Sequence, residues 1–348
     1  MIHPVGTRLS VLLIASISIA QTVQDACLRA VRPGGFRLVL QFDRHGDDLL
    51  FSVSCHARHL SVFIGQTSLN ESGGFMPDKF VMQTRFVDLP GVRIACDIAG
   101  EGAAVVFLHG GLLDRRMWDG QFEHFAGRLC AIRYDLRSSG ESETMPRTEA
   151  FSHHEDLFDL LKLLDVHRVS LIGHSNHAIA LDFALAYPSL VDKLVLVSPG
   201  LRGYDFRDPW IGTNFAAMMR ALGQRDLNGA VEVFLTMWVD GPLRRPAEVD
   251  PLVRERACEM ATRAFQLSRL APNCKGMEPP AAGRLDEIDV PTMVVLGDKD
   301  APDIHAIGQL IREAVPGSRL VRIPNVGHAL MMEKPAEFNK VVEEFLLT

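Results

Sequence analysis

The sequence of 348 residues has few cysteines and no run of basic residues. Both features limit the classes of function that the protein can have. The six cysteines are scattered, with no C-x-x-C pair and no spacing typical of a metal site. Cys96 and Cys130 fall in apolar runs and are expected to be buried fillers rather than disulfide partners. The net charge of -7, without any basic block, argues against a nucleic-acid partner.

Lysine is absent from residues 1–75, which contain six arginines. Residues 1–20 have the outline of a signal peptide, and their apolar run is too short for a comfortable transmembrane helix. The sequence therefore predicts an N-terminal extension over residues 1–81 and no integral membrane span. Two alternatives stay open: a secreted protein with a pro-like extension, or a cytoplasmic enzyme whose natural start is Met76, with the second favoured. Residues 21–75 receive no assigned place in the fold.

From residue 82 onward, short apolar runs alternate with helical periodicities, which predicts a mainly parallel sheet covered on both faces. A hairpin around Pro90-Gly91 precedes it. The alternation stops between Gly200 and Leu285, where aromatic and methionine residues recur at loosely helical spacing. The expected strands that follow the hairpin are 104–108, 130–134, 169–172, 193–197, 292–296 and 320–324.

A serine stands at a sharp turn between an expected strand and an expected helix, in the segment Gly173-His174-Ser175-Asn176. This is the sequence form of a nucleophile elbow, which exposes a serine hydroxyl to a base and to oxyanion donors. The usual G-x-S-x-G pattern has glycine where this chain has His177. Three outcomes are open: a slightly splayed elbow that keeps activity, a site with altered specificity, or a degenerate hydrolase.

An acidic residue and a histidine follow the serine, each after an expected strand. One strand runs into Gly297-Asp298-Lys299-Asp300, and the next runs into Gly327-His328. Upstream, another strand runs into His109-Gly110-Gly111, a glycine-rich turn that can aim backbone N–H groups at a developing oxyanion. The pair His153-His154 lacks metal-ligand spacing and is expected to be a solvated helix start.

These motifs together resemble α/β-hydrolase-fold enzymes of the small, single-domain esterase and lactonase type. The segment from Asp135 to Ser142 also resembles that family's D-x-R-G-x-G-x-S segment. The resemblance covers about residue 82 to the C-terminus. It implies a domain over 82–348 with a mostly parallel, eight-stranded sheet flanked by helices, and a helical cap at about 200–285.

The resemblance assigns the chemistry residue by residue. Ser175 is expected to be the nucleophile and His328 the general base. Asp300 is expected to orient the histidine, with Asp298 as the rival for that position. His109 and His174 are expected to have structural or hydrogen-bonding roles.

The oxyanion hole is expected to use the backbone N–H groups of Gly111 and Asn176. Trp210, Met218 and Trp238 of the cap are the expected substrate-binding residues.

A small carboxylic ester or lactone is the expected substrate, cleaved without a metal or organic cofactor. A C–C bond hydrolase or a cofactor-free perhydrolase would use the same triad, and a small-molecule receptor without turnover is an alternative of another class. Neither the natural substrate nor the oligomeric state follows from the sequence.

Overall fold

The computed structural model describes four strands within residues 39–76, and then residues 84–143, 150–175, 179–267 and 273–348. The chain divides into two units, Met1–Gln83 and Thr84–Thr348. The signal-like segment 1–20, Asn176 and His177 lie outside the described residues.

The first unit contains a four-stranded antiparallel sheet in the order β1-β2-β3-β4. Its strands are β1 (Val39–His45), β2 (Asp48–Cys55), β3 (Leu60–Leu69) and β4 (Phe75–Met76). The sheet therefore occupies much of the segment for which the sequence indicated no place in a fold.

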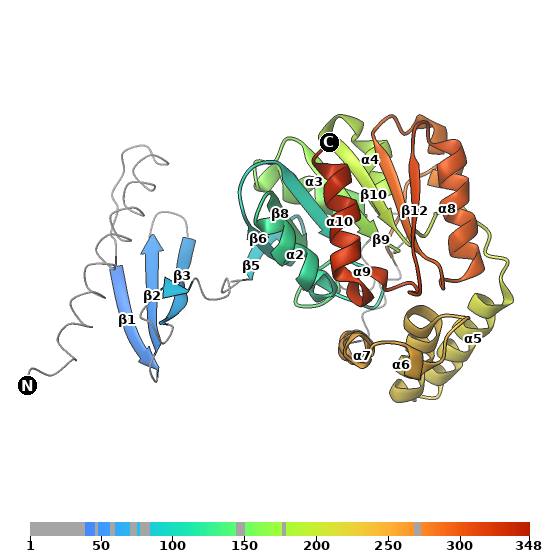
Figure 1. Ribbon diagram of the computed structural model, residues 1–348, viewed down its shortest axis with the longest axis horizontal. Coiled ribbons are helices and arrows are strands. Elements are labelled where there is room, and N and C mark those ends of the chain that lie inside the picture. Colours follow the sequence, from blue (N-terminus) through green and yellow to red (C-terminus); the bar gives the residue numbers. More distant parts are fainter. Residues whose placement is uncertain are drawn as a thin grey trace, which may run out of the picture. The chain divides into compact units, whose positions relative to one another are not determined.

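The second unit is built on an eight-stranded sheet in the order β12-β11-β10-β9-β7-β8-β6-β5 (Figure 1). The pairs β5–β6 and β6–β8 are antiparallel, and all the other pairs are parallel. This confirms the predicted fold class. The strands are β5 (Arg85–Leu89), β6 (Val92–Ala99), β7 (Ala104–Leu108), β8 (Cys130–Tyr134), β9 (Val169–His174), β10 (Val191–Val197), β11 (Thr292–Gly297) and β12 (Arg319–Ile323).

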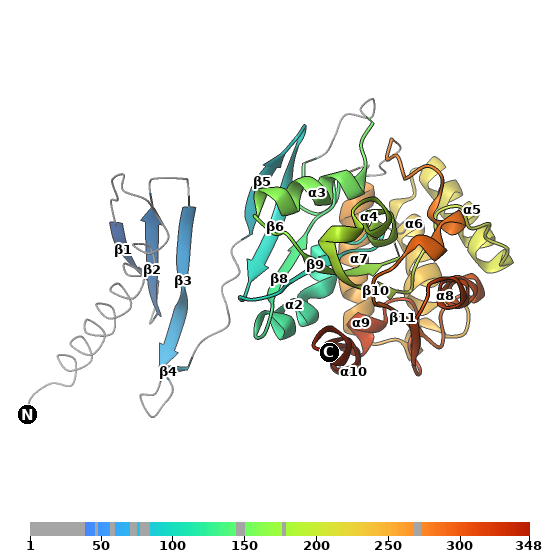
Figure 2. The same cartoon turned by 90° about the horizontal axis from the view of Figure 1, so that it is seen from above.

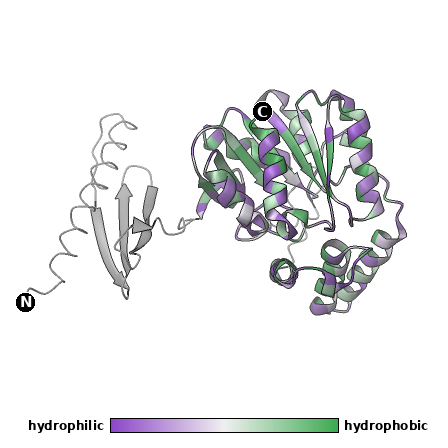
Figure 3. Ribbon diagram, in the orientation of Figure 1, coloured by the Kyte–Doolittle hydropathy of each residue, from purple (hydrophilic) through white to green (hydrophobic). Residues whose placement is uncertain are grey.

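Helices cover both faces of this sheet. Figure 2 shows α2 and α10 on one face, and α3 and α4 on the other. These helices are α2 (Asp119–Ala126), α3 (His153–Leu163), α4 (Ile179–Ala186) and α10 (Pro335–Leu346), and α8 (Pro302–Ala314) packs against β11 and β12. The central strands are hydrophobic along most of their length (Figure 3), as expected for parallel strands buried on both faces.

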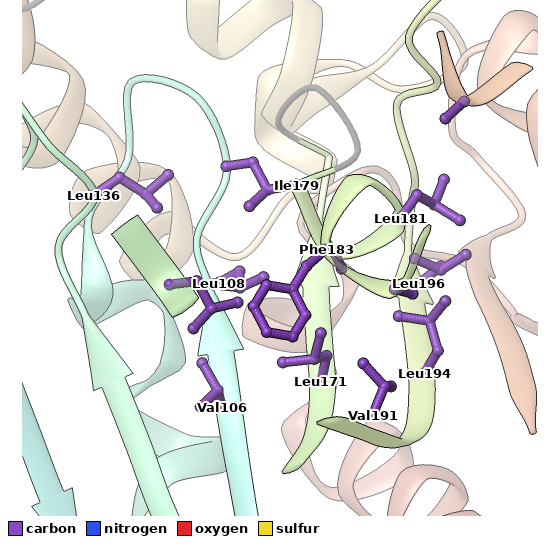
Figure 4. Packing of buried hydrophobic residues seen from close by; sticks show 14 of the residues in the cluster. Val106, Leu108, Leu136, Leu171, Ile179, Leu181, Phe183, Val191, Leu194 and Leu196 are labelled. Atoms are coloured by element: carbon purple, nitrogen blue, oxygen red, sulfur yellow. The ribbon is translucent and has the colours of Figure 1, made fainter. Parts of the chain in front are cut away.

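The core between α4 and the sheet consists of close-packed aliphatic side chains around one aromatic ring. Figure 4 shows Phe183 of α4 beside Leu108 of β7 and Leu171 of β9. All three side chains are buried. This packing fixes the helix that follows the serine turn against the strand that precedes it.

A helical insertion separates β10 from β11, where the sequence predicted a cap (Figure 1). It consists of α5 (Pro209–Gly223), α6 (Leu227–Leu235), the π-helical turn η4 (Thr236–Asp240), the short 3₁₀ turn η5 (Pro246–Glu248) and α7 (Pro251–Gln266). Asp208, Asp226 and Asp250 each precede one of the three α-helices, and their carboxylates accept hydrogen bonds from first-turn N–H groups.

The two adjacent histidines at the start of α3 are not exposed to solvent. His153 and His154 are buried at the start of α3, so the expectation of a solvated helix start was wrong. His154 Nδ1 lies 2.8 Å from Ser152 Oγ, a contact that only the folded chain reveals.

Within the described part of the chain, no helix combines the length and apolar character needed to cross a membrane.

Candidate active site

Ser175 lies directly after β9 in a left-handed backbone conformation, with φ of 52°. This conformation is uncommon for a residue with a side chain and persists only where the surroundings hold it. Two hydrogen bonds do so: the Ser175 N–H donates to Val197 O (3.1 Å), and its carbonyl accepts from Gly200 N (2.9 Å). The serine is therefore fixed at the carboxyl ends of β9 and β10.

The turn is tight because α4 approaches β9 closely. A Cβ placed on Gly173 would lie 2.7 Å from Ala180 Cβ, closer than side-chain carbons pack. On the neighbouring loop, a Cβ on Gly110 would lie 2.4 Å from His174 Nδ1. Both glycines are therefore required by space. The effect of His177 remains a prediction, since that residue lies outside the described ones.

His328 and Asp300 meet at the ends of the adjacent strands β12 and β11. His328 Nδ1 lies 2.9 Å from Asp300 Oδ2 and 3.1 Å from Oδ1, and both side chains are buried. The rival carboxylate of Asp298 instead accepts from Asn325 N–H at 2.6 Å. The structure thus brings Asp300, not Asp298, to the histidine.

The surroundings of Asp300 favour its ionised form. Burial opposes ionisation of Asp300, but the charge of His328 and the hydrogen bonds from His328 and Ala301 N–H outweigh it and hold the Asp300 pKa below its usual range. The carboxylate is therefore ionised and accepts the Nδ1–H of His328. His328 Nε2 is buried without a hydrogen-bond partner among the described residues. In the neutral ring with its proton on Nδ1, this nitrogen carries the lone pair.

A small cavity of about 40 Å³ brings Ser175 and His328 together. Its lining comes from both the sheet side and the insertion: Gly111, Leu113, His174, Ser175, Phe234, Trp238, Val239, Ala257, His328, Ala329 and Met332. The Trp238 ring lies 4.6 Å from the His328 ring, centroid to centroid.

Of the three expected substrate-binding residues, one lines this cavity. Trp238 lines the cavity, whereas Trp210 packs against the core and Met218 is buried in α5. Phe234 and Met332 were not among the expected residues. Phe234 stands four positions before Trp238 in a continuous helical stretch, and that spacing was the available signal for it. No such signal marks Met332, because His328 lies in the turn before α9 (Leu330–Glu333).

The loop after β7 presents the backbone of Gly111 to the cavity. His109 supports this loop, because its Nε2 accepts from Leu136 N–H (3.0 Å) and its Nδ1 donates to Gly110 O (2.8 Å). Asn176, the other expected oxyanion donor, lies outside the described residues.

His174 precedes the serine but is not available as a second base. Its Nε2 donates to the backbone oxygen of His328 at 3.0 Å. Burial, assisted by the charge of His328, lowers the pKa of His174 to about 3. The imidazole is therefore neutral and acts as a hydrogen-bond donor.

The segment that begins at Asp135 is hydrogen-bonded to the chain that follows the loop after β7. Asp135 accepts from Arg115 N–H (2.8 Å) and from Glu141 N–H (2.7 Å), and the Arg115 side chain also pairs with Asp97 at 3.0 Å. Gly140 has φ of 46°, and a Cβ there would lie 2.1 Å from Asp135 Oδ2. Sequence reasoning missed Arg115, which carries no local motif.

Residues 105–341 match the Alpha/beta hydrolase family. The chain is 33% identical over 270 residues to a putative 2-succinyl-6-hydroxy-2,4-cyclohexadiene-1-carboxylate synthase of Bacillus subtilis, covering 74% of this chain and 95% of that one. It is 30% identical over 275 residues to a 2-hydroxy-6-oxononadienedioate/2-hydroxy-6-oxononatrienedioate hydrolase of Cupriavidus pinatubonensis, covering 73% and 90%. Among solved structures, Est816, an N-acyl homoserine lactone degrading enzyme, is similar with a TM-score of 0.60 and 25% identity, covering 75% and 100%.

Proposed function

The chain belongs to the α/β-hydrolase family, and we propose that it is a serine hydrolase that cleaves small carboxylic esters or lactones. The observation that carries this proposal is the setting of His328. Its Nδ1 is paired with a buried aspartate, and its Nε2 has no hydrogen-bond partner among the described residues and belongs to a cavity shared with Ser175. Acyl transfer to a serine needs a base with that arrangement.

In the proposed mechanism, Ser175 Oγ attacks the substrate carbonyl carbon while His328 Nε2 takes the hydroxyl proton. Asp300 holds the imidazole in its Nδ1–H tautomer and stabilises the imidazolium that forms. The same proton then passes from Nε2 to the leaving alcohol. Water then attacks the acyl carbon while His328 Nε2 takes a proton from it. The proton passes to Ser175 Oγ, and the acid is released.

The tetrahedral intermediate carries a negative oxygen that needs backbone donors. Gly111 is assigned one N–H, because its backbone lines the cavity beside Ser175. Asn176 is assigned the second from its position directly after the nucleophile in the sequence. No metal or organic cofactor takes part in this mechanism.

The cavity lining favours an uncharged substrate. Apart from Ser175 and the two histidines, its described residues are glycine, alanine or larger apolar residues, and none is arginine or lysine. The Cupriavidus relative is named for dienedioate substrates, which carry two carboxylates. A site for such anions would be expected to offer cationic partners, so ester or lactone cleavage is the better fit for this chain.

The size of the cavity limits the acyl group. Its volume of about 40 Å³ corresponds to about three water positions. A short acyl group such as acetyl is therefore expected to be preferred. The helices of the insertion are proposed to act as the cap that closes over the substrate and excludes water.

The test compares the purified full chain with Ser175→Ala on p-nitrophenyl esters from acetate to octanoate. Loss of turnover in Ser175→Ala, with turnover kept in Ser189→Ala, supports a serine esterase. Ser189 is exposed in the 3₁₀ turn η3 (Pro188–Leu190), which follows the end of α4 that is farther from Ser175 in the sequence. Turnover that survives Ser175→Ala would refute the nucleophile. If the folded wild type does not cleave the esters but cleaves a vinylogous diketone, the protein is a C–C bond hydrolase instead.

A further inference from the structure

Arg244 and Glu333 form a buried ion pair that joins the insertion to the segment after His328. Arg244 Nη1 lies 2.5 Å from Glu333 Oε2, and Nη2 lies 3.1 Å from Oε1. Each side chain is only 6% exposed. Glu333 ends the short helix α9 (Leu330–Glu333), which begins two residues after His328.

The arginine also holds the π-helical turn η4. Its Nη2 donates to Val239 O at 2.7 Å, and its Nε donates to Asp240 O at 3.0 Å. Val239 lines the cavity, and its neighbour Trp238 packs against the ring of His328. One side chain therefore fixes the end of the turn that forms a wall of the cavity.

The glutamate holds the loop that carries the histidine. Glu333 Oε1 accepts from Gly327 N–H at 3.1 Å, one residue before His328. A Cβ on Gly327 would lie 2.3 Å from Arg244 Nη2, so glycine is needed for the guanidinium to lie there. Glu333 thus hydrogen-bonds the histidine loop, and the Arg244 guanidinium lies close to Gly327 of the same loop.

Burial makes this pair different from another ion pair that joins the insertion to the body. Arg256 of α7 pairs with Asp119 of α2 at 2.6 Å, but these side chains are 37% and 41% exposed. Exposed pairs contribute little, whereas removing one partner of a buried pair leaves an uncompensated charge. Arg256 therefore offers a matched control.

We propose that Arg244 and Glu333 are positioning residues that set the His328 loop and the Trp238 wall of the cavity through one shared ion pair. This inference rests on the proposed serine hydrolase function. It implies that any movement of η4 away from the cavity also loosens the support of the general base. Substrate admission and base alignment are then a single structural event.

The first test measures steady-state kinetics of the full chain on p-nitrophenyl acetate. Arg244→Met is expected to lower kcat at least tenfold, while KM changes less than threefold, because acetate has the shortest acyl group of the series and makes the least contact with the cavity wall. Arg256→Met is expected to keep kcat within twofold of wild type. A folded Arg244→Met protein with wild-type kcat would overturn the proposal, as would an equal loss in Arg256→Met.

A second variant guards against misfolding caused by an unpaired buried charge. Arg244→Met/Glu333→Gln removes both charges, and the glutamine amide oxygen can still accept from Gly327 N–H. This double variant is expected to fold and to recover part of the kcat lost in Arg244→Met. If the kcat of the double variant is no higher than that of Arg244→Met, the positioning role assigned to Glu333 is wrong.

A third measurement does not depend on turnover. Acrylamide quenching of Trp238 fluorescence, isolated as the difference from the matching Trp238→Phe protein, reports access to the turn η4. The quenching constant is expected to rise at least twofold in Arg244→Met and in the double variant, and to stay unchanged in Arg256→Met. If the wild type cleaves no ester, this result alone decides the proposal, and an unchanged constant would refute it.

Discussion

The imidazole of His174 donates a hydrogen bond to the backbone oxygen of His328, and the two rings lie 4.8 Å apart, centroid to centroid. The residue before the proposed nucleophile therefore holds the proposed base by its main chain. Because both histidines are buried, a change at His174 should alter the position of His328 through this hydrogen bond.

Replacing His174 by leucine removes the donor, whereas glutamine can place an amide N–H near the position of Nε2. We expect His174→Leu to lower kcat/KM about tenfold, the equivalent of one neutral hydrogen bond, and His174→Gln to recover most of it. Ester kinetics of the two folded variants would check this. Equal rates for leucine and glutamine would contradict a hydrogen-bonding role.

His174 also predicts a pH dependence of folding stability. Its pKa is about 3 in the folded chain against 6.5 as the ordinary value, so the unfolded chain binds the proton more readily. The corresponding stability is fully present above pH 6.5 and is lost as the pH falls from 6.5 toward 3. Between pH 7 and pH 5 the loss amounts to about 2 kcal/mol. Urea unfolding at both pH values should show a smaller loss for His174→Gln than for the wild type.

The two neighbouring aspartates should differ sharply when made neutral. Asp300→Asn removes the acceptor that fixes the His328 tautomer, and kcat is expected to fall about 10³- to 10⁴-fold. Asp298→Asn keeps an oxygen that can accept from Asn325 N–H, so its kcat is expected to stay within about threefold of wild type. Reversed results would show that the acid had been misassigned.

The two tryptophans of the insertion provide a test of the cavity wall. Trp238→Ala enlarges the cavity and is expected to raise the octanoate-to-acetate ratio of kcat/KM about tenfold. Both tryptophans pack against the core, but Trp210 is not among the residues that line this cavity. Trp210→Ala should therefore lose stability, on the order of 2 kcal/mol, and keep the wild-type ratio. A shifted ratio in Trp210→Ala would place that residue at the substrate after all.

Two glycines should respond in opposite directions to alanine. Gly173→Ala forces a contact with Ala180 and is expected to destabilise the fold by about 1–3 kcal/mol. Gly212 lies in α5 with nothing within 4 Å of the added carbon, so Gly212→Ala is expected to stabilise it by about 0.5–1 kcal/mol. Chemical denaturation of both variants measures the difference. A tolerated Gly173→Ala would mean that α4 can move away from β9.

Local patterns predicted the sheet, its hairpin and the strand ends well, because strand periodicity and turn residues are properties of neighbouring positions. The partners of the site were harder to predict. Arg244 and Glu333 are 89 positions apart, and no local signal links them. The insertion was predicted to be helical, but Trp210 lies in α5 and Trp238 in η4, so spacing within one helix could not show which of the two lines the cavity.

The left-handed backbone of Ser175 has a consequence for how this protein could be improved or could decay. Glycine adopts such a conformation without penalty, so Ser175→Gly is expected to be inactive and yet more stable, by about 1 kcal/mol. Selection for thermal tolerance alone would then favour loss of the hydroxyl. A directed-evolution campaign on this scaffold should therefore score turnover in every round, because heat resistance and chemistry make opposite demands on this one residue.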